Sequence, residues 1–493
     1  MSAKEIQDLN QQLEYLIGID IGTSAIKGVL MSSGGTIVSR ETAQTQYQTF
    51  EGGCIQFDAN QLYRLTADLI RRLAAALPEG ASVAGLSLSS ASGNTLLVDD
   101  KGEPLIPAFS WMDSRTDEEI EKVFGKLEED EVHEWIGWPL IKTFPLAHLS
   151  WLKCHKPELL ENSARVCMST DFINFKLTGE WGIDSSTATT FYLQDQKSAD
   201  YHLSFLQKLG IPKWKLPSIH SPGTIVGQIT PNAAVDTGLS PGTPVVLGSF
   251  DHPSAARGAG VLEEGQMLIS CGTSWVGFYP VKEREKAIRQ KMLVDPFLQP
   301  EGPWGAMFSL PAIATSIDKY ICHYISNEHD RYQTFSKLAA SAEPGAGGLM
   351  INPLLEDVLG VQAAYTKADI ARALMEGTAY LLKMQMERLE TEGMHVSSVT
   401  MVGGPSETYP WPQIVADVLG MELCTINGTC AGAAGAAILA GIGLGIYTDA
   451  RDAFDQTSFI KITRIPDKAA HEVYKDCYRE FSSKNIHSGG DSN

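Results

Sequence analysis

Residues 15–24 read Tyr-Leu-Ile-Gly-Ile-Asp-Ile-Gly-Thr-Ser, an apolar run that ends in a carboxylate and a Gly-Thr-Ser turn. A second apolar run follows at once over 25–31, which predicts a strand, a tight turn and another strand. Glycine lets the backbone of such a turn approach a ligand closely, and the neighbouring hydroxyl and N–H groups can donate to phosphate oxygens. The sequence therefore predicts a phosphate-binding turn at Gly22, Thr23 and Ser24.

The same plan recurs about 250 residues later. An apolar run over 266–270 leads to Gly272, Thr273 and Ser274, and a further strand-like run covers 275–278. A duplicated turn of this kind predicts two lobes that hold the phosphates of one nucleotide between them.

Length and charge limit the class of the protein. At 493 residues the chain exceeds what one hydrophobic core usually serves, so we expect two domains. The formal net charge of −20 argues against a nucleic-acid partner and leaves an anionic ligand to local N–H groups and magnesium. Eight cysteines without a Cys-x-x-Cys pair favour reduced thiols in a cytoplasmic protein.

Two segments bear on targeting and membranes. Residues 1–10 are polar, so we expect no signal peptide. Residues 431–447 are rich in Gly and Ala and only weakly hydrophobic. We expect this stretch to form a close-packed buried helix, and we expect no membrane partner.

Strand-like runs alternate with helical patterns, which favours an α/β layer architecture. We expect one helix capped by Asn60, one that starts at Asp369 with Thr366 in a capping box, and one with Pro412 in its first turn. The expected strands cover residues 15–20, 25–31, 36–39, 83–89, 95–98, 245–251, 266–270, 275–278 and 399–402.

Two aspartates end apolar strands. Asp20 precedes the first phosphate turn, where a carboxylate can hold Mg²⁺, although it could simply cap the turn. Asp251 ends the strand over 245–251, where a general base could take a proton from a substrate hydroxyl. The alternative for Asp251 is to cap a helix that starts at Pro253. Phosphoryl transfer needs little more than one base, a metal and a set of donors.

Further polar residues lie near these motifs. Lys27 could reach a phosphate or flank its strand, and His252 could meet a hydroxyl or be a core histidine. Trp111, Asp113 and Arg115 offer an aromatic face, a carboxylate and a guanidinium, which suit a sugar. Their structural alternative is a buried Trp beside an Asp–Arg ion pair.

Together these motifs resemble the FGGY carbohydrate kinases, the group that contains glycerol kinase, xylulokinase and gluconate kinase. The resemblance covers about residues 15–455. It is carried by five segments in order: Asp20 to Lys27, Trp111 to Arg115, Gly248 to Asp251, Gly272 to Ser274, and the adenosine-type segment that begins Gly403, Gly404, Pro405, Ser406. The Gly/Ala-rich stretch 428–447 is similar to the closing helix of the family.

The resemblance implies two actin-like, ribonuclease-H-type lobes with ATP and substrate in the cleft between them. It implies transfer of the γ-phosphate of ATP to a small sugar or polyol, with Asp251 as base and with Mg²⁺ placed by Asp20 and Asp251. It also allows a homodimer. The expected domains are an N-terminal lobe over 1–258, a C-terminal nucleotide-binding lobe over 259–455 and an extension over 456–493.

The chain departs from the family where the sugar is expected. Glycerol kinases carry Asn-Gln-Arg-Glu after the strand that ends near residue 88, and xylulokinases carry Gln-Met-His, whereas this chain has Ser-Ser-Ala-Ser over 89–92. Ser90 and Ala91 are the candidate sugar contacts there. The acceptor is therefore not expected to be glycerol, and D-xylulose is in doubt. The resemblance as a whole implies a small ketose such as a pentulose, a polyol or a sugar acid. A sensor without catalysis or an actin-like ATPase is the competing interpretation.

Overall fold

The computed structural model describes residues 14–116, 119–355, 365–426 and 430–485. The polar start at 1–10 and positions 428–429 of the Gly/Ala-rich stretch lie outside these ranges. The chain divides into two compact units. Unit 1 comprises 1–262, 287–305 and 429–458, and unit 2 comprises 263–286, 306–428 and 459–493.

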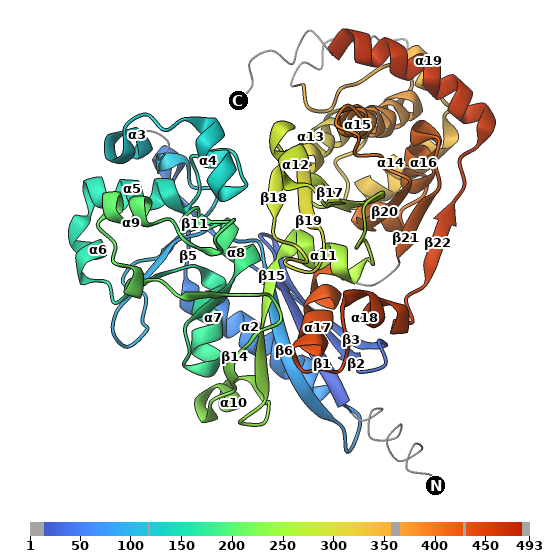
Figure 1. Ribbon diagram of the computed structural model, residues 1–493. Helices are drawn as coiled ribbons and strands as arrows, with labels where there is room; N and C mark the ends of the chain where they lie inside the picture. The colour runs from blue at the N-terminus through green and yellow to red at the C-terminus, as the bar shows by residue number, and fades with distance from the viewer. Residues whose placement is uncertain (1–13, 117–118, 356–364, 427–429, 486–493) are drawn as a thin grey trace. The chain divides into compact units, whose positions relative to one another are not determined.

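Unit 1 is built on a six-stranded sheet in the order β14-β15-β6-β1-β2-β3 (Figure 1). β1 and β15 both run parallel to β6, which lies between them, whereas β2 and β3 continue antiparallel from β1. The strands are β1 (Glu14–Ile21), β2 (Ala25–Ser32), β3 (Ile37–Gln44), β6 (Ser82–Ser90), β14 (Ile225–Gln228) and β15 (Pro244–Phe250).

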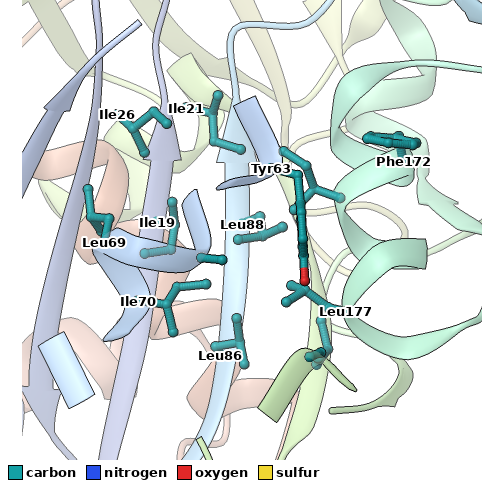
Figure 2. Close-up of a cluster of buried hydrophobic side chains, with 14 of the residues drawn as sticks. Ile19, Ile21, Ile26, Tyr63, Leu69, Ile70, Leu86, Leu88, Phe172 and Leu177 are labelled. Atoms are coloured by element: carbon teal, nitrogen blue, oxygen red, sulfur yellow. The ribbon is translucent and has the colours of Figure 1, made fainter. Parts of the chain in front are cut away.

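Helices cover both faces of this sheet, which is why β1 is apolar along nearly its whole length. On one face α2 (Ala59–Ala75) and α7 (Ser169–Thr178) supply side chains to a core with Ile19, Leu86 and Leu88 (Figure 2). On the other face lies α17 (Ala431–Gly443).

Glycine permits the close approach of α17. A Cβ at Gly18 would lie 1.9 Å from the Ala433 carbonyl, and a Cβ at Gly435 would lie 1.8 Å from the Ser254 carbonyl of α11 (Asp251–Gly258). Backbone therefore meets backbone at both contacts, and no larger residue fits. The expectation of a close-packed buried helix is confirmed over 431–443. None of the helices in the described ranges is long and apolar enough to cross a membrane.

Short helices and strands complete unit 1. They are β4 (Gln48–Thr49), β5 (Ile55–Phe57), β7 (Leu96–Val98), β8 (Ala108–Phe109), α3 (Glu119–Phe124), α4 (Glu129–Ile136), α5 (Pro145–His155), α6 (Pro157–Asn162), β9 (Arg165–Cys167), β10 (Gly182–Asp184), α8 (Ser185–Thr189), β11 (Gln194–Asp195), β12 (Asp200–Tyr201), α9 (Leu203–Leu209), β13 (Ser218–His220), α10 (Pro231–Thr237), β18 (Leu293–Asp295) and α18 (Ala450–Gln456).

Unit 2 repeats the central part of this plan. β16 (Gln266–Cys271) and β17 (Trp275–Val281) form a hairpin, and β20 (Ser398–Gly403) runs parallel to β16. Strands β21 (Leu423–Ile426) and β22 (Lys461–Arg464) extend the sheet beyond β20. The helices are α13 (Ile313–Tyr320), α14 (Arg331–Ser341), α15 (Lys367–Glu390), α16 (Trp411–Leu419) and α19 (Lys468–Asn485), while α12 (Arg284–Arg289) and β19 (Trp304–Leu310) span points where the chain passes from one unit to the other.

Local signals were confirmed at two of the three helix starts expected from the sequence. Thr366 and Asp369 form the expected capping box of α15, although the helix begins at Lys367, and Pro412 lies in the first turn of α16. The cap of α2 is Asp58, whose side chain accepts from the Gln61 N–H, so the cap expected at Asn60 is wrong by two residues. Asp58 is the cap because its side-chain oxygen reaches the backbone N–H of Gln61, three residues later.

The compact units are discontinuous in sequence, unlike the expected segments 1–258, 259–455 and 456–493. The reason is packing: α17 buries its surface on β1 and α11, so 429–458 belongs with unit 1. In unit 2, buried Tyr474 of α19 donates to Glu376 of α15, which ties the C-terminal helix into that unit.

Candidate active site

The two aspartates meet at one edge of the unit 1 sheet. Parallel strands end at the same edge, so the last residues of β1, β6 and β15 are neighbours. Asp20 pairs in register with Ser89, and Phe250 pairs with Ser90. Asp251 is the residue after β15. Polar groups from three segments far apart in sequence thus gather at one place.

The charge on Asp20 is disfavoured by its surroundings. Burial and then the Asp251 carboxylate raise the pKa of Asp20 from its ordinary value of 3.8 to about 7. Lys27 and the Ser89 hydroxyl, which donates to Asp20 Oδ1 at 3.1 Å, act in the opposite direction. Lys27 pairs across from Asp20 in β2 and is exposed.

The first turn of α17 lies against the same carboxylate. A Cβ at Gly432 would fall 2.4 Å from Asp20 Oδ2, so any larger residue there would displace the carboxylate. The N-terminal end of a helix carries partial positive charge, which suits an anionic group.

Asp251 begins α11 rather than preceding it. Its Oδ1 accepts from the His252 N–H at 2.8 Å, so one oxygen caps the turn, and the helix does not start at Pro253 as the capping alternative required. The side chain is 23% exposed, and His252 Nε2 lies 3.9 Å from Oδ1. Within the described ranges Oδ2 accepts no hydrogen bond, which leaves that oxygen for another partner.

The first phosphate turn is tied to Trp111. The Gly22 N–H closes the turn on the Ala25 carbonyl at 3.1 Å. The Trp111 indole N–H donates to Thr23 Oγ1 at 3.2 Å. Because an indole N–H is only a donor, Thr23 accepts this bond and its own hydroxyl proton stays available for an anion.

Asp113 and Arg115 form the ion pair of the structural alternative. Asp113 is fully buried, and its oxygens accept from Arg115 Nε and from the Ile55 N–H at 3.0 Å. The Arg115 guanidinium lies 4.3 Å from the centre of the Phe109 ring. These contacts hold the loop that carries Trp111, and a sugar contact by Asp113 or Arg115 remains a prediction.

The loop that follows β6, where the sequence differs from the glycerol kinase and xylulokinase motifs, is fixed by a backbone hydrogen bond. The Ala91 N–H donates to the Ile21 carbonyl at 2.9 Å, which binds the loop to the end of β1. Ser90 is fully buried, and its hydroxyl has no hydrogen-bond partner among the described residues. The hydroxyl is therefore closed off from solvent in this structure, and a sugar contact by Ser90 remains a prediction.

Unit 2 brings its two motifs together in the same way. Cys271 at the end of β16 pairs with Gly403 at the end of β20, so Gly272 to Ser274 and Gly403 to Ser406 follow neighbouring parallel strands. Gly403 has φ +98°, and a Cβ there would lie 2.3 Å from the Cys271 carbonyl. Ser274 Oγ accepts from the Ala312 N–H at 3.1 Å, and Ser406 Oγ donates to the Gly403 carbonyl at 2.7 Å.

Sequence reasoning missed several residues at the unit 1 edge. Ser89 lay in the quoted loop without a role, and Gly432 lay in the Gly/Ala-rich stretch, where nothing in the sequence joined it to Asp20. Ser186 and Asp295, described below, had no motif around them.

The donor set fits a divalent cation. Two carboxylates that repel each other at a partly exposed site offer the hard oxygen ligands that Mg²⁺ prefers. No cluster of three or more His, Cys, Asp or Glu side chains able to hold a metal occurs in the part of the chain that the structure describes. Such sparse protein ligation is usual where phosphate oxygens and water complete the shell.

Comparison with known proteins agrees with the family resemblance seen in the sequence motifs. Residues 15–258 match the N-terminal domain of the FGGY family of carbohydrate kinases, and 267–444 match its C-terminal domain. The chain is 25% identical to a xylulose kinase of Staphylococcus epidermidis over 490 residues, covering 95% of this chain and 96% of that protein. It is 26% identical to the autoinducer-2 kinase of Escherichia coli K12, covering 95% and 93%.

The fold comparison agrees. The crystal structure of xylulose kinase from Rhodospirillum rubrum has a TM-score of 0.84 at 24% identity, covering 96% of this chain and 98% of that one. The duplicated strand–turn–strand plan is that of the actin-like ATPase-type fold, as expected from the sequence. The chain belongs to the FGGY family of carbohydrate kinases and is a sugar kinase, a phosphotransferase that acts on an alcohol group.

Proposed function

We propose that this kinase transfers the γ-phosphate of ATP to a hydroxyl of a small ketose such as a pentulose, a polyol or a sugar acid, with Asp251 as general base. ATP is the donor that the family implies. The observation that carries the proposal is the Asp251 carboxylate itself, partly exposed beside Asp20 at the carboxyl edge of the sheet, with Oδ2 unused.

The residues divide the work by their chemistry. Asp251 takes the proton of the acceptor hydroxyl as the oxygen attacks phosphorus. Asp20 would hold Mg²⁺, which would supply positive charge beside the phosphate oxygens. Thr23 and Ser24 donate to phosphate in unit 1, while Gly272, Thr273 and Ser274 do so in unit 2. Residues 403–406 receive the nucleoside.

The acceptor is proposed by class only. In this proposal Trp111 offers its face to the carbon-bound hydrogens of a sugar, and Ser90, Ala91 and His252 are the candidate contacts to its hydroxyls. The names of the relatives make D-xylulose and autoinducer-2 the first compounds to try. The cytoplasmic location and the homodimer remain predictions.

The test is ADP release from Mg-ATP against D-xylulose, autoinducer-2, other pentuloses, hexuloses, pentitols, glycerol and aldonates. We expect turnover on one acceptor, reduced by roughly three or more orders of magnitude in Asp251→Ala because proton transfer is lost. Near-normal turnover of the variant would remove Asp251 from the role of base. Silence across the whole panel would favour the non-catalytic sensor, although both carboxylates are retained.

A further inference from the structure

Strand β15 bulges immediately before Asp251. Leu247 pairs with Leu88 of β6, but the next pair joins Phe250 to Ser90, so two residues of β15 oppose one of β6. A Cβ at Gly248 would lie 1.9 Å from the Leu88 carbonyl, which keeps this position for glycine. Bulges re-aim a strand and interrupt its ladder, so the residues that follow need other partners.

Phe250 finds its partner outside the sheet. Its N–H donates to Ser186 Oγ at 3.1 Å, and the Ser186 hydroxyl donates to Asp295 Oδ2 at 2.7 Å. Ser186 lies in α8 and Asp295 ends β18, and both side chains are fully buried. A single hydroxyl proton satisfies this chain of bonds, because Ser186 accepts from Phe250 and donates to Asp295.

Arg257 holds the preceding residue. From α11 it donates through one guanidinium nitrogen to Ser249 Oγ at 2.9 Å and through the other to the Phe297 carbonyl. Its guanidinium also lies 4.8 Å from the centre of the Phe297 ring. Both residues before Asp251 are therefore fixed by groups from the segment 184–186, α11 and the segment 295–297.

The network is costly to bury. Burial raises the pKa of Asp295 to about 7 and that of Asp184, which caps α8, to about 6. Burial also lowers the pKa of Arg257 to about 10, against the opposing effect of both carboxylates. Asp295 Oδ1 and Arg257 Nε have no hydrogen-bond partner among the residues described. Apolar residues of similar volume often serve stability equally well, so a stabilising role alone is a weak explanation for the charged set.

We propose that Asp295, acting through Ser186, is a positioning residue that fixes the backbone at Phe250 and so aims the Asp251 carboxylate at the acceptor hydroxyl. The inference rests on the proposed role of Asp251 as base. Asp295 contacts no substrate in this scheme. A misplacement of about 1 Å at a catalytic group can cost on the order of a hundredfold in rate, so such support is worth its cost.

Amide hydrogen exchange on the full-length protein tests the geometry without any acceptor. In Ser186→Ala the Phe250 amide loses its partner, and exchange in the peptide over 246–254 should rise by about tenfold or more. Asp295→Ala should raise exchange in this peptide to a similar degree. Asp295→Asn keeps an acceptor for the Ser186 hydroxyl, so its exchange should stay near that of the wild type. Asp171→Asn is the matched control, since Asp171 is equally buried in unit 1 but accepts from the Met168 N–H. Unchanged exchange in Ser186→Ala would overturn the inference.

Steady-state kinetics with the sugar that proves to be the acceptor distinguish failure of the positioning role from failure of the proposed function. Ser186→Ala and Asp295→Ala should lower kcat by about tenfold to a hundredfold, with the KM values for ATP and sugar changed by less than about threefold. Asp295→Asn should recover most of kcat. If Asp251→Ala is inactive but the other variants match wild type, only the positioning role fails. If Asp251→Ala is active, the proposed function itself fails.

Discussion

At the scale of single residues, Asp20 is where stability and function oppose each other. Its pKa of about 7 lies above the ordinary 3.8, so between these values the folded protein keeps a proton that the unfolded chain has released. The contribution of Asp20 to stability is therefore greatest below pH about 4, falls as pH rises to about 7, and is flat above that.

Asp20→Asn should remove this pH dependence and lose activity. In magnesium-free buffer the variant should gain unfolding free energy relative to wild type, by roughly 2 kcal/mol at pH 5 and roughly 4 kcal/mol at pH 8. Urea titrations at several pH values measure the difference. A gap that stays constant across this range would contradict the raised pKa. Kinase activity should fall because the proposed magnesium ligand is gone.

The Trp111 indole N–H donates to Thr23 Oγ1 and so joins the proposed sugar contact to the proposed phosphate turn. Trp111→Phe keeps an aromatic face but removes the indole N–H, and a hydrogen bond of this kind is worth about 0.5–1.5 kcal/mol. We expect kcat to fall by about threefold to tenfold while the sugar KM changes little, whereas Trp111→Ala should mainly raise that KM. Steady-state kinetics decide this, with exposed Trp214→Phe as control. A rise in KM alone for Trp111→Phe would refute the link.

At the scale of elements, the contact between α11 and α17 joins two helices that each meet one of the aspartates. Asp251 begins α11, and the first turn of α17 lies against Asp20. The two helices meet backbone to backbone at Gly258 and Gly435. A methyl group at either glycine has no space unless the helices separate.

Gly435→Ala should therefore destabilise unit 1 by roughly 1–3 kcal/mol and lower kcat, because overpacking moves α11. Differential scanning calorimetry and ADP release measure the two effects. Gly34→Ala is the control, since a Cβ there would meet only Ser32 Oγ at 3.9 Å. An unchanged melting temperature for Gly435→Ala would show that the helices separate easily.

At the scale of the whole molecule, each compact unit is built from three segments that are separate in the sequence. In unit 2 the last helix, α19, contributes Tyr474, whose hydroxyl donates to Glu376 Oε1 at 2.9 Å. That oxygen also accepts from Arg372 Nε at 2.9 Å and from the Gly345 N–H at 3.0 Å. The expected extension after residue 455 thus includes part of a core.

Tyr474→Phe should destabilise unit 2 by about 1–3 kcal/mol, because the buried Glu376 and Arg372 lose a partner. Removal of residues 459–493 should leave unit 2 unfolded while the transition of unit 1 persists. Calorimetry, read as two transitions, checks both. A truncated chain that retains both transitions would show that α19 is dispensable.

Local patterns in the sequence determined the two strand–turn–strand units, the parallel strands beside them, the buried Gly/Ala helix and, through motif order, the family. These features depend on residues close together in the chain, where apolar periodicity and turn chemistry operate. The same patterns placed Asp20 and Asp251 at strand ends, and parallel pairing made those ends neighbours.

Only the tertiary structure decided which distant groups complete the site. Asp295 meets Ser186 from 109 residues away, and Ser186 meets Phe250 from 64 residues away. It also joined 429–458 to unit 1. A buried polar group takes whichever partner packing brings within hydrogen-bond distance, and no local pattern in the sequence encodes that distance.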